Sequence, residues 1–237
     1  MYRIGEWHLN IILYLRIGER VIENIIEKGA CMHPILMELK EQLEITGNIV
    51  EDGINLLYKY EKHIVAEHSK NVAVEAERLA DLLGENCTSA RIAGALHDIS
   101  AIIPDHKKIE IAESLDINIL DEEREFPSII HQKISREIAN ILFGITNEEI
   151  LSAICCHTTL KSNPTRLEMI LFIADKLKWD QKGIPPYLDN VKNGLEKSLE
   201  DGVFIFIKYL YENKSNLKVL HPWLIESYNF FSELIGS

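Results

Sequence analysis

Four histidines and two aspartates form a candidate metal-binding set spread along the sequence. They are His68, His97, Asp98, His131, His157 and Asp175. Neutral imidazoles and carboxylates that converge from separate elements can hold a divalent metal and leave a coordination position open for water. The adjacent residues His97 and Asp98 are the candidate catalytic pair. These residue types therefore indicate metal-dependent hydrolysis.

The aspartate at position 175 carries the most information, because it ends an apolar segment. Residues 170–174 read Ile-Leu-Phe-Ile-Ala, and burying a carboxylate among such side chains is costly unless it is paired or binds a metal. An exposed position or a salt bridge with Lys178 is the alternative for Asp175. A single histidine in an amphipathic helix is likewise more often a half-buried surface residue than a ligand. The other histidines lack such surroundings and are interpreted as structural or surface groups: His8, His33, His63, His106 and His221.

The elements that must position these residues are expected to be helices, because almost every apolar segment repeats at helical spacing. Gly84 is expected to end the first of them, and Thr165 with Glu168 has the spacing of a capping box. The expected caps of two further helices are Thr88 or Ser89, and Asn147. The predicted helices cover residues 68–83, 88–100, 104–115, 127–143, 147–157 and 165–179, then 188 to about 212 and 222–234. Since no strand pattern is present, the predicted fold class is all-α.

The N-terminal part is harder to place. Residues 1–49 are expected to form a helical extension, with a helix from about residue 9 to 28 and a second, less regular one, and residues 50–237 the main domain. Met32 is an alternative start of the protein, since nothing before it resembles the candidate site. The apolar stretch at 9–15 is shorter than a membrane span and no small-residue cleavage pattern follows it. We therefore expect neither an export signal nor a membrane anchor.

Composition narrows the class of protein. With 237 residues, 46% of them apolar, the chain can bury one main core. A formal net charge of −12 gives no electrostatic basis for binding duplex nucleic acid, so an anionic substrate needs metal ions or local lysine and arginine side chains. The cysteines are Cys31, Cys87 and the adjacent Cys155 and Cys156, a pair poorly placed for a mutual disulfide. A reducing compartment, the cytoplasm, is expected.

The ordered series of candidate ligands resembles a known family. His68, then His97-Asp98, then Asp175 has the H…HD…D order of the HD superfamily of metal-dependent phosphohydrolases. Further matching segments are IIH at 129–131, CHTT at 156–159, RLEMILFIADKL at 166–177 and HPWLIESY at 221–228. The series is similar to the bacterial HD-domain symmetrical bis(5′-nucleosyl)-tetraphosphatases, which split diadenosine tetraphosphate into two ADP. The resemblance covers roughly residues 50–235 and implies an HD-domain helical bundle.

This resemblance also implies a centre of two divalent metals, usually iron, with manganese or cobalt as alternatives. His68, His97, Asp98 and Asp175 match the ligands of one metal, and His131 and His157 match those of the second, with Asp98 bridging. Two metals can lower the pKa of a shared water and neutralise charge on the attacked phosphoryl group. Thr158 and Thr159 are candidates for contacts with phosphate, although hydroxyl groups at that place are also typical of a helix end.

Three positions depart from the family pattern around the expected metal ligands. Ala101 stands where many relatives have a basic residue, Glu67 precedes the first histidine in place of an arginine nearby, and Gln132-Lys133 replaces a Gly-Pro pair. Other basic residues are then needed near phosphate, and Lys133 and Lys161 are the main candidates. Further candidates are Arg166, Lys176, Lys178 and Lys182. Each of them is alternatively part of a solvated helix face.

The sequence thus predicts an enzyme that acts on a small nucleotide, with diadenosine tetraphosphate as the first substrate to test. The same centre acting on another nucleotide phosphate ester is one alternative. A regulatory protein that binds a nucleotide without catalysis is another, although six retained ligand candidates argue against it. The oligomeric state is left open, with a homodimer among the alternatives.

Overall fold

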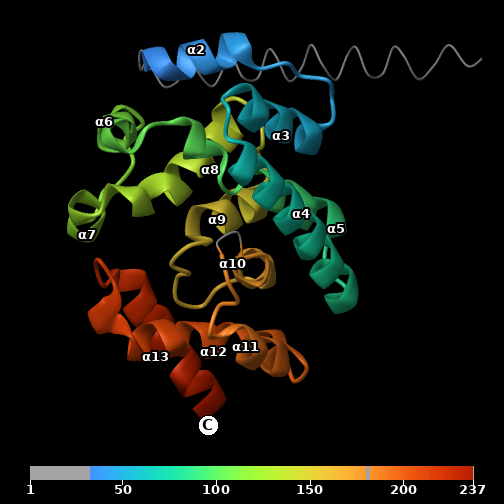
Figure 1. The fold of residues 1–237 in the computed structure, drawn as a ribbon, viewed down its shortest axis with the longest axis vertical. Coiled ribbons are helices and arrows are strands. Elements are labelled where there is room, and N and C mark those ends of the chain that lie inside the picture. Colours follow the sequence, from blue (N-terminus) through green and yellow to red (C-terminus); the bar gives the residue numbers. More distant parts are fainter. Residues whose placement is uncertain (1–32, 180–181, 237) are drawn as a thin grey trace, which may run out of the picture.

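The computed structural model describes residues 33–179 and 182–236, which form a bundle of helices (Figure 1). No β-strand occurs in these residues, which confirms the all-α class. The α-helices are α2 (Pro34–Gln42), α3 (Ile49–Lys59), α4 (His63–Leu83), α5 (Cys87–Leu96), α6 (Lys108–Ser114), α7 (Asp121–Glu125), α8 (His131–Ile141), α9 (Glu148–Cys156), α10 (Arg166–Leu177), α11 (Leu188–Leu195), α12 (Leu199–Glu212) and α13 (Pro222–Gly236). Short 3₁₀ helices join them at η1 (Ile99–Ile102), η2 (Asp105–Lys107), η3 (Pro127–Ile130) and η4 (Lys214–Asn216).

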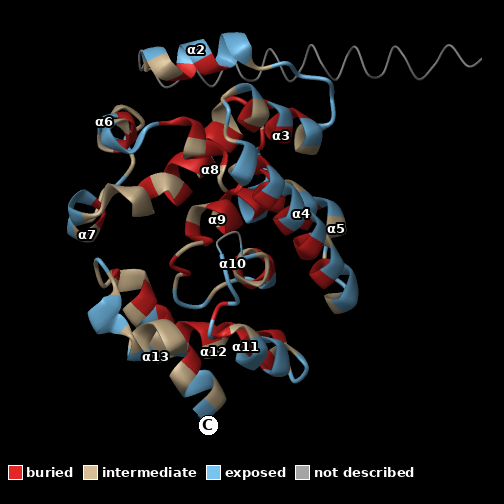
Figure 2. Ribbon diagram, in the orientation of Figure 1, coloured by how far each residue is buried: buried red, intermediate tan, exposed pale blue. Residues whose placement is uncertain are grey.

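The core lies where α4, α5, α8, α9 and α10 meet. Figure 2 shows buried residues concentrated in these helices, and side chains such as Leu96, Ile134, Ile154 and Phe172 are completely buried there. Helices α11, α12 and α13 form a layer at the C-terminal end of the bundle, where α12 packs against α10 (Figure 1). The inward faces of these five helices therefore enclose the hydrophobic core.

Helices α4 and α5 pack closely against each other, and this contact depends on Gly94. A Cβ atom on Gly94 would lie 2.6 Å from the Cα atom of Ala73 in α4. Any side chain at position 94 would consequently push the two backbones apart, whereas glycine allows them to touch. This contact sets the separation of the two helices that carry His68 and His97.

Several helix ends agree with the signals in the sequence. Gly84 ends α4 in the left-handed conformation with a φ of 71°, which glycine adopts without steric cost. Asn147 caps α9, and Thr165 and Glu168 form the expected capping box at the start of α10. The caps that flank His157 and Asp175 were therefore predictable from local sequence alone.

Two other boundaries differ from those expected. Helix α4 begins at His63 rather than at His68, so His68 lies within the helix. Helix α5 is capped by Asn86, whose side chain accepts a hydrogen bond from the backbone N–H of Ser89. The prediction of Thr88 or Ser89 as the cap is wrong, because Asn86 already fills that role.

The long helix expected between residues 188 and 212 is two helices, α11 and α12. Ser198 breaks it, and its side chain caps α12 by accepting a hydrogen bond from the N–H of Asp201. The two helices then fold back on each other, and a Cβ on Gly194 would lie 3.0 Å from the Cα of Gly202. Helix α7 was not expected either. The last helix runs over Pro222–Gly236, close to its predicted extent.

The N-terminal predictions are only partly open to comparison. The helix expected at 9–28 and the alternative start at Met32 lie outside the described residues, while α2 corresponds to the second, less regular helix. Leu36 and Leu39 of α2 belong to the same buried apolar cluster as the main bundle. The division of the chain after residue 49 stays a prediction. Cys87, Cys155 and Cys156 are free thiols, and no described helix has the length and apolar content needed to span a bilayer.

Candidate metal site

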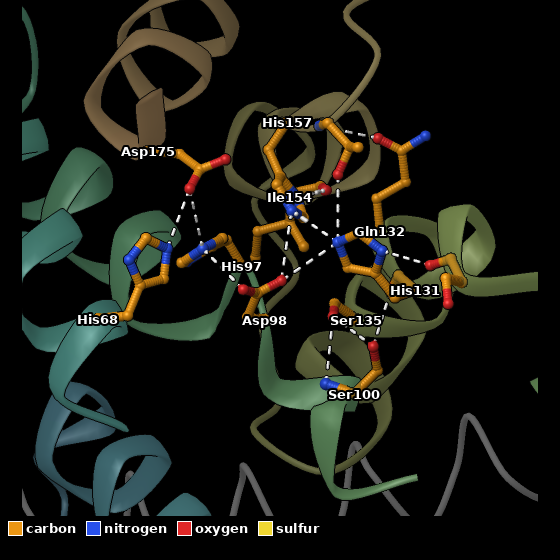
Figure 3. A network of polar contacts seen from close by, with 12 residues as sticks. His68, His97, Asp98, Ser100, His131, Gln132, Ser135, Ile154, His157 and Asp175 are labelled. Atoms are coloured by element: carbon orange, nitrogen blue, oxygen red, sulfur yellow. Dashed lines mark hydrogen bonds and ion pairs between the residues drawn. The ribbon is translucent and has the colours of Figure 1, made fainter. Parts of the chain in front are cut away.

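The six candidate ligands come from five helices and converge on one place (Figure 3). His68 lies in α4, Asp175 lies in α10, and His131 is the first residue of α8. His97 and His157 are the C-caps of α5 and α9, and Asp98 directly follows His97. Ligand atoms fall within 4.8 Å of one another in three overlapping groups: His68, His97 and Asp98; His97, His157 and Asp175; and Asp98, His131 and His157.

Each of the four histidine rings is fixed by a hydrogen bond from its Nδ1 to a main-chain carbonyl. The acceptors are Lys178 at 2.9 Å for His68, Gly94 at 2.8 Å for His97, Ser128 at 2.7 Å for His131 and Ile154 at 2.8 Å for His157. A carbonyl oxygen can only accept, so the proton of the neutral ring lies on Nδ1. Each Nε2 therefore carries a lone pair that points into the cluster, which is the arrangement of a metal-ligating histidine.

Three of these hydrogen bonds follow one local pattern. His97, His131 and His157 each stand at the C-terminal end of a helical segment and donate to the carbonyl three residues earlier. Carbonyl groups in the last turn of a helix lack partners within that helix, so a polar side chain at the cap can satisfy one of them. The helix ends thus orient the rings.

The Nε2 atoms of His97, His131 and His157 are not satisfied by hydrogen bonds within the cluster. The Nε2 of His97 is buried without a hydrogen-bond partner, 3.3 Å from Asp98 Oδ2 and 3.8 Å from Asp175 Oδ1. His131 Nε2 and His157 Nε2 lie only 3.0 Å apart. Two lone pairs cannot face each other at that distance, and buried polar atoms are almost always paired. A cation between these atoms would resolve both conflicts, so the donor set fits a divalent metal.

The two carboxylates are placed differently. Oδ1 of Asp98 lies 3.2 Å from His131 Nε2 and 3.5 Å from His157 Nε2, whereas its Oδ2 faces His97. Asp98 therefore reaches both halves of the cluster, as a bridging ligand would. Asp175 lies 3.0 Å from His68 Nε2 through Oδ1 and receives the ammonium group of Lys176 at 2.5 Å on Oδ2.

Electrostatics within the cluster favour charged carboxylates. Burial opposes the ionised form of Asp98, but His97 and the neighbouring rings hold the pKa of Asp98 well below its usual range. Burial also opposes a charged His97 ring, yet Asp98 and Asp175 outweigh it and raise the pKa of His97 to about 9, so without a metal its Nε2 would hold a proton in the place of the cation. For His157 burial dominates, and with the charge on neighbouring rings it lowers the pKa to about 4. Two partly buried carboxylates thus attract cations to this point.

A cleft of about 300 Å³ opens beside the cluster. Asp98, His131 and Thr158 line one end of it, and the Oγ1 of Thr158 lies 3.1 Å from His131 Nε2. Thr159, in contrast, is buried outside the cleft and accepts a hydrogen bond from the side-chain amide of Gln132 at 2.9 Å. Of the two expected phosphate contacts, only Thr158 faces the open space beside the cluster.

Lys133 and Lys161 are not among the residues that line this cleft, because both are held by buried carboxylates. Lys133 lies 2.8 Å from Glu123 Oε2 and 5.1 Å from the ring centroid of Trp223. Lys161 lies 2.7 Å from Glu168 Oε1 at the cap of α10. These positions differ from the expected contact with phosphate, since each ammonium group already neutralises an internal charge.

The further candidates are also placed by ion pairs. Arg166 contacts Glu85 and Glu200, and Lys178 contacts Glu75. Lys176 differs from the other candidates because its partner is Asp175, a candidate metal ligand. Lys182 is exposed in the loop before α11. The salt bridge with Lys178, which was the alternative to a ligand role for Asp175, does not form, and Asp175 pairs with the adjacent Lys176.

Sequence reasoning missed a lysine that does line the cleft, Lys108 in α6. Its side chain is buried and shares the inward face of that helix with Ile111 and Ala112. The spacing of Lys108 and Ile111, three residues apart on a helix, was a signal that the lysine points inward. The shortness of α6 hid this periodicity.

Comparison with known proteins agrees with this geometry. The model of the HD domain family matches residues 65–180. An uncharacterized protein in the pepC 5′ region of Lactococcus lactis subsp. cremoris is 45% identical over 140 residues, which cover 59% of this chain and 71% of that protein. A protein of Staphylococcus aureus named symmetrical bis(5′-nucleosyl)-tetraphosphatase is 31% identical over 113 residues, 47% of this chain and 57% of its own length, so the match spans little more than half of it.

Among solved structures, a predicted HD superfamily hydrolase involved in NAD metabolism from Clostridium acetobutylicum superimposes with a TM-score of 0.69. The two proteins are 26% identical, and the superposition covers 78% of this chain and 97% of the other. The match therefore extends well beyond the motif residues to most of the described bundle. The chain belongs to the HD domain family and is an HD-type hydrolase.

Proposed function

We propose that the protein is a metal-dependent phosphohydrolase that cleaves the central phosphoanhydride of diadenosine tetraphosphate and releases two ADP. The observation that carries the proposal is the buried Nε2 of His97, which faces two carboxylates and has no hydrogen-bond partner. Such an atom is costly unless a cation binds it. The name of the Staphylococcus aureus relative supports the choice of substrate.

Six side chains would hold the metals in this proposal. His68, His97, Asp98 and Asp175 would hold one ion, and His131 and His157 the second, with Asp98 between them; iron is proposed first, and manganese or cobalt are alternatives. When bound, a metal pair supplies Lewis-acid stabilisation of the phosphoryl oxygens and lowers the pKa of a shared water. The overall reaction adds one water across the bridging P–O bond, and each half leaves as ADP.

The residues of the chain would then orient the substrate. Asp98 and His131 line the cleft, so the phosphate chain would enter from that side. The hydroxyl of Thr158, 3.1 Å from His131 Nε2, is placed to contact a phosphate oxygen beside the second ion. Main-chain carbonyls would hold the four rings in place, so the rings would not need to move when the substrate binds. Such preorganised groups stabilise the transition state without a cost of reorganisation.

The test combines metal analysis with a nucleotide panel. The purified protein, loaded with iron or manganese under reducing conditions, is incubated with diadenosine tetraphosphate, diadenosine triphosphate, a nicotinamide dinucleotide and nucleoside monophosphates. ADP as the only nucleotide product of diadenosine tetraphosphate is the expected result. Nucleoside release from monophosphates without turnover of dinucleotides would instead favour a nucleotidase.

A regulatory protein without catalysis would give a different result. It would retain far less than one metal per chain after reloading and would hydrolyse none of these nucleotides. A cytoplasmic location and a homodimer stay predictions, and cell fractionation and light scattering would test them.

A further inference from the structure

The cleft beside the metal site has a second wall that the proposed catalytic groups do not use. Its residues are Ala101, Lys108, Phe126, Ser128 and Ile129. Lys108 supplies the only lysine or arginine side chain on the lining, and it is only 6% exposed. A lysine is almost never so deeply buried unless its charge has a partner.

The partner of Lys108 is Asp105, which stands outside the cleft. Asp105 Oδ1 lies 2.7 Å from Lys108 Nζ, and its Oδ2 accepts a hydrogen bond from the Oγ of Ser128 at 3.0 Å. The Asp105 side chain is 68% exposed and does not line the cleft. Lys108 therefore lines the cleft while the carboxylate that pairs with it does not, and an ammonium group has three N–H donors, of which Asp105 uses one.

Ser128 connects this wall to the metal site. Its hydroxyl holds Asp105, while its main-chain carbonyl accepts the hydrogen bond from Nδ1 of His131 at 2.7 Å. The position of the ammonium group is thus tied to the position of a candidate ligand. A chain of phosphates that reaches from Asp98 and His131 across the cleft would arrive at Lys108. Among the residues that line the cleft, no other lysine or arginine could contact these phosphates. Ala101, at the position where many relatives carry a basic residue, has no charge.

We propose that Lys108 is a specificity-determining residue that binds the phosphate group next to the one attacked, and that Asp105 and Ser128 are its positioning residues. The ligand class is a nucleoside di- or polyphosphate, in which two linked phosphates can contact the metal site and the ammonium group together. A single phosphate ester at the metals would lack the second phosphate that this contact needs. This inference rests on the proposed function for the identity of the substrate, but not for the binding of ADP.

The experiment compares Lys108→Met with Lys107→Met. Both variants lose one positive charge, but the side chain of Lys107 is 40% exposed and pairs loosely with Glu110 at 3.7 Å. Binding of ADP and of the single-phosphate ester AMP to the metal-loaded proteins is measured by calorimetry, and KM and kcat are measured for diadenosine tetraphosphate. A charge-assisted hydrogen bond contributes roughly 1.5–3 kcal/mol, or about a 10-fold to 100-fold change in affinity.

Lys108→Met is expected to weaken ADP binding and raise KM for the dinucleotide by about that factor, with metal content and AMP affinity unchanged. Lys107→Met should behave like the original protein, and Lys108→Arg should recover part of the affinity. If Lys108→Met does not fold, Lys108→Gln replaces it.

The outcomes separate this inference from the proposed function. Unchanged ADP affinity and KM in the folded Lys108 variant would overturn the role of Lys108 while leaving the phosphohydrolase intact. Loss of ADP binding in that variant, in a protein that does not cleave diadenosine tetraphosphate, would support Lys108 and reject the proposed substrate. A metal-loaded original protein that binds neither ADP nor pyrophosphate would overturn both.

Discussion

At the scale of single residues, the imidazole rings decide what the site can do. In each ring Nδ1 donates a hydrogen bond to a main-chain carbonyl, so Nε2 is the nitrogen that can bind a cation. This holds for His68, His97, His131 and His157. Asp98 joins the two halves of this arrangement through its two oxygens. The candidate centre therefore depends on one carboxylate more than on any single ring.

Replacing Asp98 with alanine tests this dependence. We expect the Asp98→Ala variant to lose most of its bound metal and at least about 100-fold in turnover, because even an outer partner of a metal ligand contributes 10–100-fold. Metal content is measured by elemental analysis and turnover by ADP release. Asp121→Asn, a change at an exposed aspartate of α7, serves as the control. A folded Asp98→Ala variant with normal activity would remove Asp98 from the mechanism.

The two adjacent threonines should respond in opposite ways. Thr158→Val removes a hydroxyl that lines the cleft, so we expect a several-fold loss in kcat/KM and little change in stability, since a neutral hydrogen bond contributes about 1 kcal/mol. Thr159→Val leaves the buried amide of Gln132 without its acceptor and should lower the free energy of unfolding by about 1–3 kcal/mol. Kinetics and urea denaturation of both variants check this, and equal effects in the two would contradict it.

At the scale of elements, a buried ionic network joins α7, α8 and His221, the residue that precedes α13. Glu123 of α7 is completely buried, accepts from Lys133 at 2.8 Å and from the N–H of Leu120 at 2.9 Å, and lies 3.4 Å from His221. Burial opposes the charge on Glu123, but these three partners together lower its pKa. The network fixes the segment that precedes His131.

Glu123→Gln should therefore destabilise the fold in a pH-dependent way. Because the folded pKa of Glu123 is lowered, its contribution is present above the unfolded value of about 4.3 and is lost as the pH falls through the folded value. We expect a loss of about 3 kcal/mol at pH 7, since one partner of a buried pair is removed. The difference should shrink below about pH 4. Denaturation at several pH values checks it, with Glu125→Gln, an exposed position of α7, as control.

Helices could be predicted from the sequence where their ends are marked by nearby residues. An aspartate at the end of an apolar helical segment and the caps at Asn147 and Thr165 identified the helices around the site. The break at Ser198 was not visible, because the apolar repeat continues through it and the fold-back depends on contact between Gly194 and Gly202. Lys108 was missed for a related reason, since α6 is too short to show a periodic face.

At the scale of the whole molecule, the site ties together helices that are far apart in sequence. The candidate ligands span α4 to α10, and the helices that carry them make up the core (Figures 1 and 2). A metal that binds only the folded chain stabilises it by mass action. The net charge of −12 adds to this effect, because divalent cations reduce repulsion near two partly buried carboxylates.

Removal of metal should therefore lower the melting temperature. At metal concentrations about 100 times the dissociation constant, binding contributes about 2.7 kcal/mol, which corresponds to roughly 5–10 °C for a chain of this size. Calorimetry of metal-loaded and chelator-treated protein measures the shift. The Asp98→Ala variant should show little of it. Equal melting temperatures for loaded and chelated original protein would argue against binding at the core.

The hydrogen bonds from Nδ1 to main-chain carbonyls also determine when the rings become ordered. Gly94, Ser128 and Ile154 offer their carbonyls in these positions only once the ends of α5, η3 and α9 have formed. The conformational entropy of collecting the imidazoles is consequently lost during folding and not during metal uptake. Fraying of one of these helix ends would release its ring and its metal together. The absorption spectrum of a bound cobalt ion would then report on local unfolding in the core of the protein.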